Sequence, residues 1–291
     1  MVIAGSSNYT GAPYLAASGA MRVGAGLVTL AVAEVLHPIL AARLAEATYL
    51  LLPHEMGALV PDAQKVLADR ISGYDALLLG PGLGTDDKTA GFVSRLISSP
   101  AVDKKARLGF VGASSYPGTR EARLPPLVID ADGLNALARI NGWEQALSRP
   151  AILTPHPGEM ARLLKTTVAE VEAKRLEAAT RAAREWNVVI VLKGAYTLIA
   201  APDGQLCINP FATPALATAG TGDVLAGVIA GLLAQGLSPY DAAVAGAFIH
   251  GLAGQLVAEE VGPAGAVAGD LLPRLPHALR HVASSSVERA V

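Results

Sequence analysis

The stretch 214–236, PALATAGTGDVLAGVIAGLLAQG, constrains the fold most, because a glycine-rich turn there leads directly into a strongly apolar helix. Gly220 and Gly222 let the backbone turn tightly and leave amide N–H groups uncovered by side chains. The helix predicted from 224 to 234 aims its unpaired N–H groups and positive dipole end at this turn, which favours a phosphate or a developing oxyanion. Asp223 stands at the mouth of this predicted anion site, either as a reacting acid or base or as an ordinary residue of the first helical turn.

The composition predicts a chain with a large buried core. Of the 291 residues, 52% are hydrophobic and 16% are charged, and the net charge is −2. These proportions favour one domain, 1–291, built around one large sheet. Because basic runs are lacking and aromatic residues are few, nucleic acid is not an expected partner. The Ala- and Gly-rich stretches 224–234 and 242–258 are too short or too weakly apolar for a membrane span, so we expect a soluble protein.

Cysteine usage and the first residues bear on the cellular compartment. Cys207 is the single cysteine, which excludes an intramolecular disulfide and a multi-cysteine metal site and fits a reducing, cytoplasmic compartment. The first residues do not form a basic region followed by an apolar stretch, so we expect no secretory signal. Met1 lies only a few residues before the first predicted strand, which leaves room for a preceding segment or domain in a longer native chain.

Short apolar runs alternate with helical patterns, which predicts an α/β fold with a mostly parallel sheet and helices on both faces. After a first strand at the N-terminus, strands are predicted at 27–32, 76–79, 127–129, 151–154 and 188–192. Helices are predicted at 12–23, 35–44, 88–97, 133–138, 168–186, 239–259 and 271–283. The runs 197–200 and 205–208 are expected to pair as a hairpin over a Pro-Asp-Gly turn. The stretch 98–126 has no sustained period and predicts an irregular surface excursion.

Two predicted strands end in glycine-rich or polar turns. The first strand is followed by Ser6 and the motif NYTGA, 8–12, and the strand 76–79 by GPGLG, 80–84. The carboxyl ends of parallel strands are where α/β sheets present ligands, although Ser6 and Asn8 could equally cap the next helix. Neither these turns nor GTGD fits GxGxxG or GxxxxGK[ST]. The sequence therefore argues against a dinucleotide Rossmann site and a Walker A loop.

Titratable residues follow the next strands. Asp130 and Asp132 end the strand 127–129 and could bind a cation through water or orient a hydroxyl, or Asp132 could only cap the following helix. His156 lies between two prolines on a rigid connection, which favours ligand contact, whereas Glu159 could be a first-turn acid. His250, on an apolar helix face, is expected to be a core residue.

A buried strand, 188–192, ends in Lys193 and Gly194. The ammonium and the glycine backbone could meet a phosphate or a nucleotide, or the lysine could simply reach solvent. Asn209 follows the predicted hairpin and precedes the central stretch.

Taken in order, NYTGA, GPGLG, DADGLNAL, TPHPGE, LKGAYT and ATAGTGDVLAG resemble the ADP- or ATP-dependent NAD(P)H-hydrate dehydratase family of the ribokinase-like superfamily, from about residue 2 to 258. GTGD alone is shared across the superfamily, and its combination with NYTGA and HPGE is more specific. The resemblance implies a ribokinase-like three-layer sandwich. The excursion 98–126 is longer than the family pattern leads us to expect.

The resemblance also implies site residues. It assigns catalysis to Asp223 as the acid-base residue, with Gly220, Thr221 and Gly222 supplying N–H groups. The residues implied to line the hydrated nicotinamide nucleotide are Ala12, Gly84, Asn135, His156 and Asp223. Those implied to line ADP or AMP are Lys193, Gly194, Ala195, Tyr196, Thr197, Asn209 and Gly222.

The activity implied by the resemblance is the repair of hydrated NADH and NADPH. Asp223 would accept a proton from the C6 hydroxyl as that oxygen attacks the terminal phosphoryl group of ADP or ATP, and phosphate would then be eliminated. Mg²⁺ would be bound mainly through the phosphates, without a protein metal site. A helix N-terminus lowers the pKa of such a base and nearby phosphates raise it, and the sequence leaves this balance open.

The family further implies a homotetramer and a fused or separate NAD(P)H-hydrate epimerase as a partner. Three other functions stay open at this stage. A kinase of a small vitamin-precursor or sugar alcohol would use the same base and anion site. A catalytically silent nucleotide-binding module is opposed by Asp223, its flanking glycines and Lys193. An NAD-dependent oxidoreductase lacks its dinucleotide motif.

Overall fold

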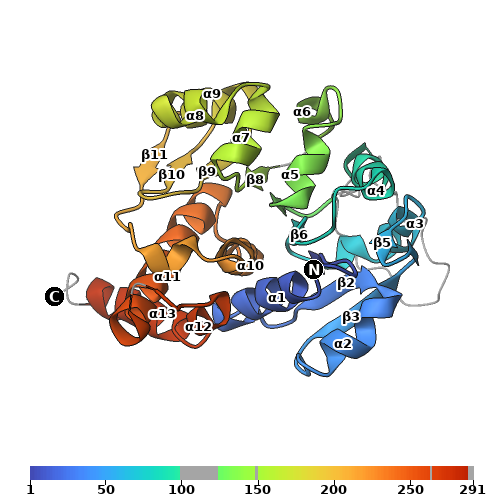
Figure 1. The fold of residues 1–291 in the computed structure, drawn as a ribbon, viewed down its shortest axis with the longest axis horizontal. Helices are drawn as coiled ribbons and strands as arrows, with labels where there is room; N and C mark the ends of the chain where they lie inside the picture. Colours follow the sequence, from blue (N-terminus) through green and yellow to red (C-terminus); the bar gives the residue numbers. More distant parts are fainter. Residues whose placement is uncertain (99–123, 148–149, 263, 288–291) are drawn as a thin grey trace, which may run out of the picture.

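The computed structural model describes residues 1–98, 124–147, 150–262 and 264–287. Short strands alternate with helices throughout these residues (Figure 1). The strands of the main sheet are β1 (Val2–Ile3), β2 (Thr29–Ala33), β3 (Thr48–Leu52), β6 (Leu77–Leu79), β7 (Leu127–Ile129), β8 (Ala151–Leu153), β9 (Val189–Leu192), β10 (Leu198–Ala200) and β11 (Leu206–Ile208). A second, two-stranded sheet consists of β4 (His54–Glu55) and β5 (Ala58–Leu59).

The main sheet has nine strands in the order β11-β10-β9-β8-β7-β6-β1-β2-β3. Pairing is parallel from β9 to β3, whereas β10 and β11 are antiparallel. The residues of β1, β6, β7, β8 and β9 are all buried, as expected for apolar strands covered by helices on both faces. The predicted parallel sheet and its hairpin are therefore confirmed.

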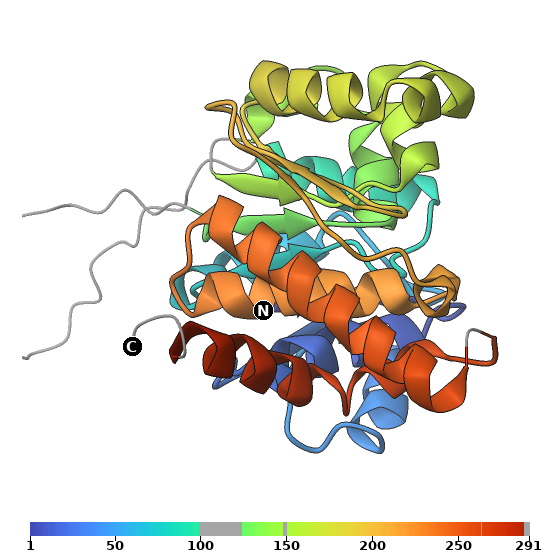
Figure 2. The ribbon, with the colours of Figure 1, turned by 90° about the vertical axis from the view of Figure 1, so that its left-hand side faces the viewer.

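One face of the sheet is covered by α1 (Gly11–Arg22), α10 (Thr221–Ala234) and α11 (Pro239–Val261), with α12 (Ala268–Leu271) and α13 (Leu275–Val287) outside them (Figure 2). Helices α1 and α10 touch along their backbones, because a Cβ on Gly227 would lie 2.0 Å from the Ala16 carbonyl oxygen. A Cβ on Gly231 would lie 2.8 Å from the Ala20 carbonyl oxygen. The glycines of the central stretch thus fix α10 tightly against α1.

The other face carries α4 (Asp87–Ser98), α5 (Asp132–Leu137), α7 (Pro157–Leu164) and α9 (Arg175–Trp186) (Figure 2). Shorter helices are α2 (His37–Ala41), α3 (Ala63–Ala68), α6 (Trp143–Ala146) and α8 (Val168–Ala173). Trp143 and Trp186 pack edge to face at 5.0 Å and join α6 to α9. Helices on both faces of the sheet confirm the predicted three-layer α/β fold.

Some element boundaries differ from the prediction. The single helix predicted at 168–186 is wrong, since α8 ends at Ala173 and Lys174 has φ −134° and ψ 40°. Thr167 and Glu170 form a capping box that starts α8, and a separate helix, α9, starts at Arg175. The helix predicted at 35–44 is a 3₁₀ turn, Glu34–Leu36, followed by the short α2. Most of the predicted excursion 98–126 lies outside the described residues.

Helix α11 is long and apolar enough to cross a membrane by length and composition, yet 56% of its most apolar window is buried inside the protein. It packs against α10 and α13 and over β8, β9 and β10. These contacts account for its apolar side chains, as in the core helix of a layered α/β protein.

Candidate active site

The turn before α10 has the conformation that glycine allows. Gly220 is the N-cap of α10 with φ +90°, and a Cβ there would lie 2.7 Å from Leu15 Cδ1. A side chain at this position would therefore be both strained and crowded. The N–H groups of Gly220, Gly222 and Asp223 have no acceptor among the described residues. Such unpaired donors at a helix start suit an anion, which is the ligand that the sequence predicts here.

The Thr221 N–H was predicted to be available to an anion, but the N–H and hydroxyl of Thr221 form hydrogen bonds within the turn itself. Its N–H donates to the Thr218 carbonyl at 3.4 Å, and its hydroxyl donates to the carbonyls of Leu216 and Thr218. His250 Nε2 lies 2.9 Å from the Thr221 carbonyl. Burial lowers the pKa of His250 to about 4, so the ring is neutral and donates this hydrogen bond. The expectation that His250 is a core residue is confirmed.

Asp223 lies in the first turn of α10 and is half-buried. Its side chain has no hydrogen-bond partner among the residues that the structure describes. Burial raises the pKa of Asp223 to about 7, the charge of Asp130 adds to this, and the Lys193 ammonium opposes it. Desolvation and the neighbouring carboxylates thus raise this pKa from within the protein, before any phosphate contributes. A carboxyl group with this pKa can accept a proton near neutral pH.

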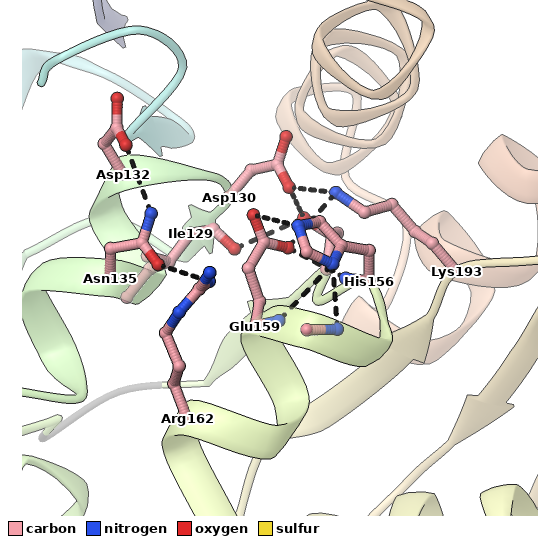
Figure 3. Close-up of polar contacts among 10 residues, drawn as sticks. Ile129, Asp130, Asp132, Asn135, His156, Glu159, Arg162 and Lys193 are labelled. Carbon is pink, nitrogen blue, oxygen red and sulfur yellow. Dashed lines mark hydrogen bonds and ion pairs between the residues drawn. The ribbon is translucent and has the colours of Figure 1, made fainter. Parts of the chain in front are cut away.

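Asp130 and Lys193 form a buried ion pair behind this helix terminus (Figure 3). Lys193 Nζ lies 2.7 Å from Asp130 Oδ1 and 3.6 Å from Glu159 Oε2. The Thr154 hydroxyl also donates to Asp130 Oδ1 at 2.7 Å. A Cβ on Gly222 would lie 3.4 Å from Nζ, so the ammonium is directed toward the start of α10 and not into solvent.

Asp132 joins the turn after β6 to the centre of the site. Its Oδ2 accepts the Gly84 N–H at 2.9 Å, and Gly84 has φ +87°. Its Oδ1 accepts from Asn135 Nδ2 at 3.2 Å, while Asn135 Oδ1 accepts from Arg162 at 2.9 Å (Figure 3). Neither of these two side-chain hydrogen bonds of Asp132 involves an N–H group of the α5 backbone. Asn135, predicted to line the substrate, is used here to orient Asp132.

His156 is the N-cap of α7. Its Nδ1 accepts from the Gly158 N–H at 2.9 Å and the Glu159 N–H at 3.4 Å. Glu159 Oε2 in return accepts the His156 N–H at 2.8 Å, which completes a capping box. Burial, Lys193 and Arg162 lower the pKa of His156, in agreement with an unprotonated Nδ1. Nδ1 is thus used in the fold, while Nε2 of the half-exposed ring lies 3.4 Å from Glu159 Oε1.

Most of the residues predicted to bind the adenine nucleotide surround one cavity of about 370 Å³, called here the first cavity. Its lining includes Lys193, Gly194, Ala195, Thr197, Asn209 and Gly222. Tyr196 does not belong to this lining and is 55% exposed, with φ +55°. Asn209 is buried and donates to the Ala247 carbonyl at 2.9 Å, and its Oδ1 has no partner in the described structure. A buried acceptor without a partner at a cavity wall suits a ligand donor group.

Arg175 supports the loop after β9, a role that the sequence analysis missed. Its guanidinium donates to the Ala195 carbonyl at 2.8 Å and to the Leu192 and Lys193 carbonyls at 3.5 Å. A Cβ on Gly194 would lie 2.9 Å from its Nη2. The only local signal is an arginine at a helix start, which many solvent-exposed arginines share.

A second cavity, of about 540 Å³, lies where β1 and β6 end. It is formed by the β1–α1 turn, the β4–β5 hairpin and the β6–α4 turn, and Gly84 is one of its lining residues. Ala12 lies nearby, since a Cβ on Gly82 would come within 2.8 Å of Ala12 Cβ. The described residues contain no group of three or more His, Cys, Asp or Glu side chains arranged to hold a metal ion.

The fold and the site define the chain as a ribokinase-like α/β protein with a carboxyl group and unpaired N–H groups at the start of α10. A ribokinase-like superfamily protein of Enterococcus faecalis is 26% identical, with a TM-score of 0.75 over 96% of this chain and 86% of that chain. The NAD(P)H-hydrate dehydratase family matches residues 1–106 and 113–277. The chain belongs to this family.

Relatives carry the same description. An ADP-dependent (S)-NAD(P)H-hydrate dehydratase of Neisseria meningitidis is 37% identical over 94% of this chain and 81% of its own length. A bifunctional NAD(P)H-hydrate repair enzyme of Moorella thermoacetica is 45% identical over 97% of this chain. The chain spans only about half, 49%, of that relative. An ADP/ATP-dependent NAD(P)H-hydrate dehydratase from Bacillus subtilis, co-crystallised with ATP and Mg²⁺, has a TM-score of 0.75 at 32% identity, covering 96% of this chain and 88% of that chain.

Proposed function

We propose that this chain converts the S form of hydrated NADH or NADPH back to the dihydronicotinamide nucleotide, with ADP or ATP driving the loss of water. The observation that carries the proposal is the placement of Asp223, whose pKa is raised to about 7, beside unpaired N–H groups and next to Gly222, which lines the first cavity. The names of the Neisseria and Bacillus relatives support the same activity.

The proposed reaction has two stages. Asp223 accepts the proton of the C6 hydroxyl while that oxygen attacks the terminal phosphoryl group, and the N–H groups of Gly222 and Asp223 stabilise the transferring group. The C6–O bond then breaks, phosphate departs, and loss of a C5 proton restores the ring double bond. The products are NAD(P)H, phosphate and AMP when ADP is the donor. The oxygen of the lost water leaves in the phosphate.

The proposal includes a magnesium ion that binds together with the nucleotide. The described residues offer no protein ligand set for a metal, and Asp130 and Glu159 already face Lys193. The ion would therefore be held mainly through the phosphates, whose negative charge it would neutralise.

The wider setting of the enzyme is also a proposal. We propose a cytoplasmic homotetramer that works together with an NAD(P)H-hydrate epimerase. The bifunctional Moorella relative supports the epimerase partner, and the single cysteine fits a reducing compartment. Light scattering of the purified protein tests the tetramer.

The direct test incubates the purified protein with hydrated NADH, magnesium and either ADP or ATP, and follows the absorbance of regenerated NADH. Recovery that depends on the nucleotide is expected, and its rate with each donor identifies the preferred one. Absence of recovery with both donors, from protein shown to be folded, would overturn the proposal.

The alternative is a kinase of a small vitamin-precursor or sugar alcohol. A hydroxyethylthiazole kinase from Pyrococcus horikoshii shares the fold, with a TM-score of 0.56 at 19% identity. This likeness shows the fold alone, whereas the family match supports the dehydratase. A stable phosphorylated product in the same assay would favour the kinase.

A further inference from the structure

The second cavity is held in place by contacts that the β4–β5 hairpin makes on two sides. The Ser7 hydroxyl donates to the Met56 carbonyl at 3.0 Å. A Cβ on Gly57 would lie 1.9 Å from Ser7 Oγ, so the hairpin approaches the β1–α1 turn as closely as glycine permits. On the other side, Lys88 of α4 forms an ion pair with Glu55. Figure 1 shows β5 beside α4 and β2.

Two large apolar side chains stand exposed at this cavity. Met56 is 90% exposed and Tyr9 is 54% exposed, and both contribute to the cavity lining. Tyr9 rests on the β6–α4 turn, where a Cβ on Gly82 would lie 2.7 Å from Tyr9 Cβ. An aromatic ring and a polarizable thioether at the mouth of a cavity suit the flat face of a nucleobase.

The acidic residues of the cavity already have partners. Asp86 accepts the Lys88 and Thr89 N–H groups at the start of α4, at 3.0 and 3.1 Å. Asp87 forms an ion pair with Arg139. These contacts, together with the Lys88–Glu55 pair, offset the negative charge that would otherwise repel a phosphorylated ligand.

Gly84 links the second cavity to the centre of the site through its hydrogen bond to Asp132. Gly84 lines the cavity, its N–H is held by Asp132, and the charge of Asp132 contributes to the raised pKa of Asp223. The first cavity, beyond Gly222 and Lys193, is occupied by the co-substrate in the proposed function. A dinucleotide whose ring reacts at Asp223 therefore has the second cavity available for its other half.

We propose that the second cavity binds the adenylyl half of the dinucleotide substrate, with the adenine in contact with Tyr9 and Met56. This inference rests on the proposed function, and nothing in the family resemblance assigned Tyr9, Met56 or the hairpin. The β4–β5 hairpin is then a substrate-binding element, which explains why it is fixed both to the turn after β1 and to α4.

The test combines a variant with a shortened substrate. Tyr9→Ala and Met56→Ala are each assayed with hydrated NADH and with the hydrate of reduced nicotinamide mononucleotide, which lacks the adenylyl group. Each variant is expected to lower kcat/KM about tenfold for the dinucleotide, the order expected for one lost contact to a base. For the mononucleotide the variants and the wild type are expected to agree within about twofold.

Leu27→Ala is the matched control, since Leu27 is an apolar residue that is 65% exposed and lies outside this cavity. It is expected to leave both substrates unaffected. Equal losses on both substrates, or no loss on either, would overturn the inference while wild-type turnover still upholds the proposed function. If the wild type fails to recover NADH at all, the proposed function fails first, so the two failures are distinguishable.

Discussion

The Lys193 ammonium pairs with Asp130 at 2.7 Å and forms no ion pair with Asp223, although its charge acts on both. Asp130 and Glu159 raise the pKa of Lys193 against the effect of burial, so the ammonium stays charged at the rear of the site. Asp223 therefore keeps a proton affinity that suits a base near neutral pH. The ammonium beside the first cavity is thus paired with Asp130 and not with Asp223, the group that accepts a proton in the proposed reaction.

The first prediction concerns the pH dependence of turnover. Because the pKa of Asp223 is raised to about 7 and only the ionised carboxylate accepts a proton, kcat/KM should fall below about pH 7, approaching tenfold per pH unit. Initial rates of NADH recovery across pH measure this acid limb. A limb near the ordinary aspartate pKa of 3.8 would contradict the electrostatics described here.

The same pKa predicts a change in stability. A carboxyl group whose pKa rises on folding contributes stability that is fully present below its unfolded pKa and is lost as the pH rises through about 7. Asp223→Asn should therefore raise the free energy of unfolding at about pH 8 by about 2–4 kcal/mol, and by much less near pH 4. Urea unfolding of both proteins at the two pH values tests this. An equally large gain at both would show that another effect dominates.

Asp130→Asn should act on both stability and pH dependence. Loss of one partner from a buried ion pair costs about 3–5 kcal/mol. The acid limb of kcat/KM should also move to lower pH, because a like charge is lost and Lys193 is released toward Asp223. Asp69→Asn, an exposed aspartate after α3, serves as the control and should change neither quantity. An unchanged acid limb would show that the charge of Asp130 does not raise the pKa of Asp223.

Arg175→Met should weaken nucleotide binding more than chemistry. The guanidinium donates hydrogen bonds to the carbonyls on both sides of Gly194 and so holds this loop in position. Its loss should therefore raise KM for ADP or ATP about tenfold, while kcat changes less than about threefold. Arg184→Met, an exposed arginine on the same helix, is the control. A fall in kcat with KM unchanged would contradict a role in loop positioning.

The sequence predicted the elements whose signal is local. Buried strands such as β7 and β9 are continuous apolar runs, and the glycine turn before α10 is readable because φ +90° at Gly220 suits glycine alone. The sequence could not predict that Lys193 would turn toward Asp130, because 63 residues separate them and only the sheet order brings them together.

The sequence also could not predict how deeply each site residue is buried. The raised pKa of Asp223 depends on how much solvent the surrounding strands and helices exclude, which no local pattern contains. The break at Lys174 was missed because the apolar period continues through it. The β4–β5 hairpin was missed because its strands are only two residues long.

The central claim is that Asp223 is the base of a nucleotide-dependent dehydration. Its most direct test measures NADH recovery from hydrated NADH by the wild type and Asp223→Asn, together with ADP binding by calorimetry. Recovery by the wild type, a loss of about 10²–10⁴-fold in kcat for the variant, and retained ADP affinity are expected. Near-normal turnover by a folded Asp223→Asn protein would contradict the account.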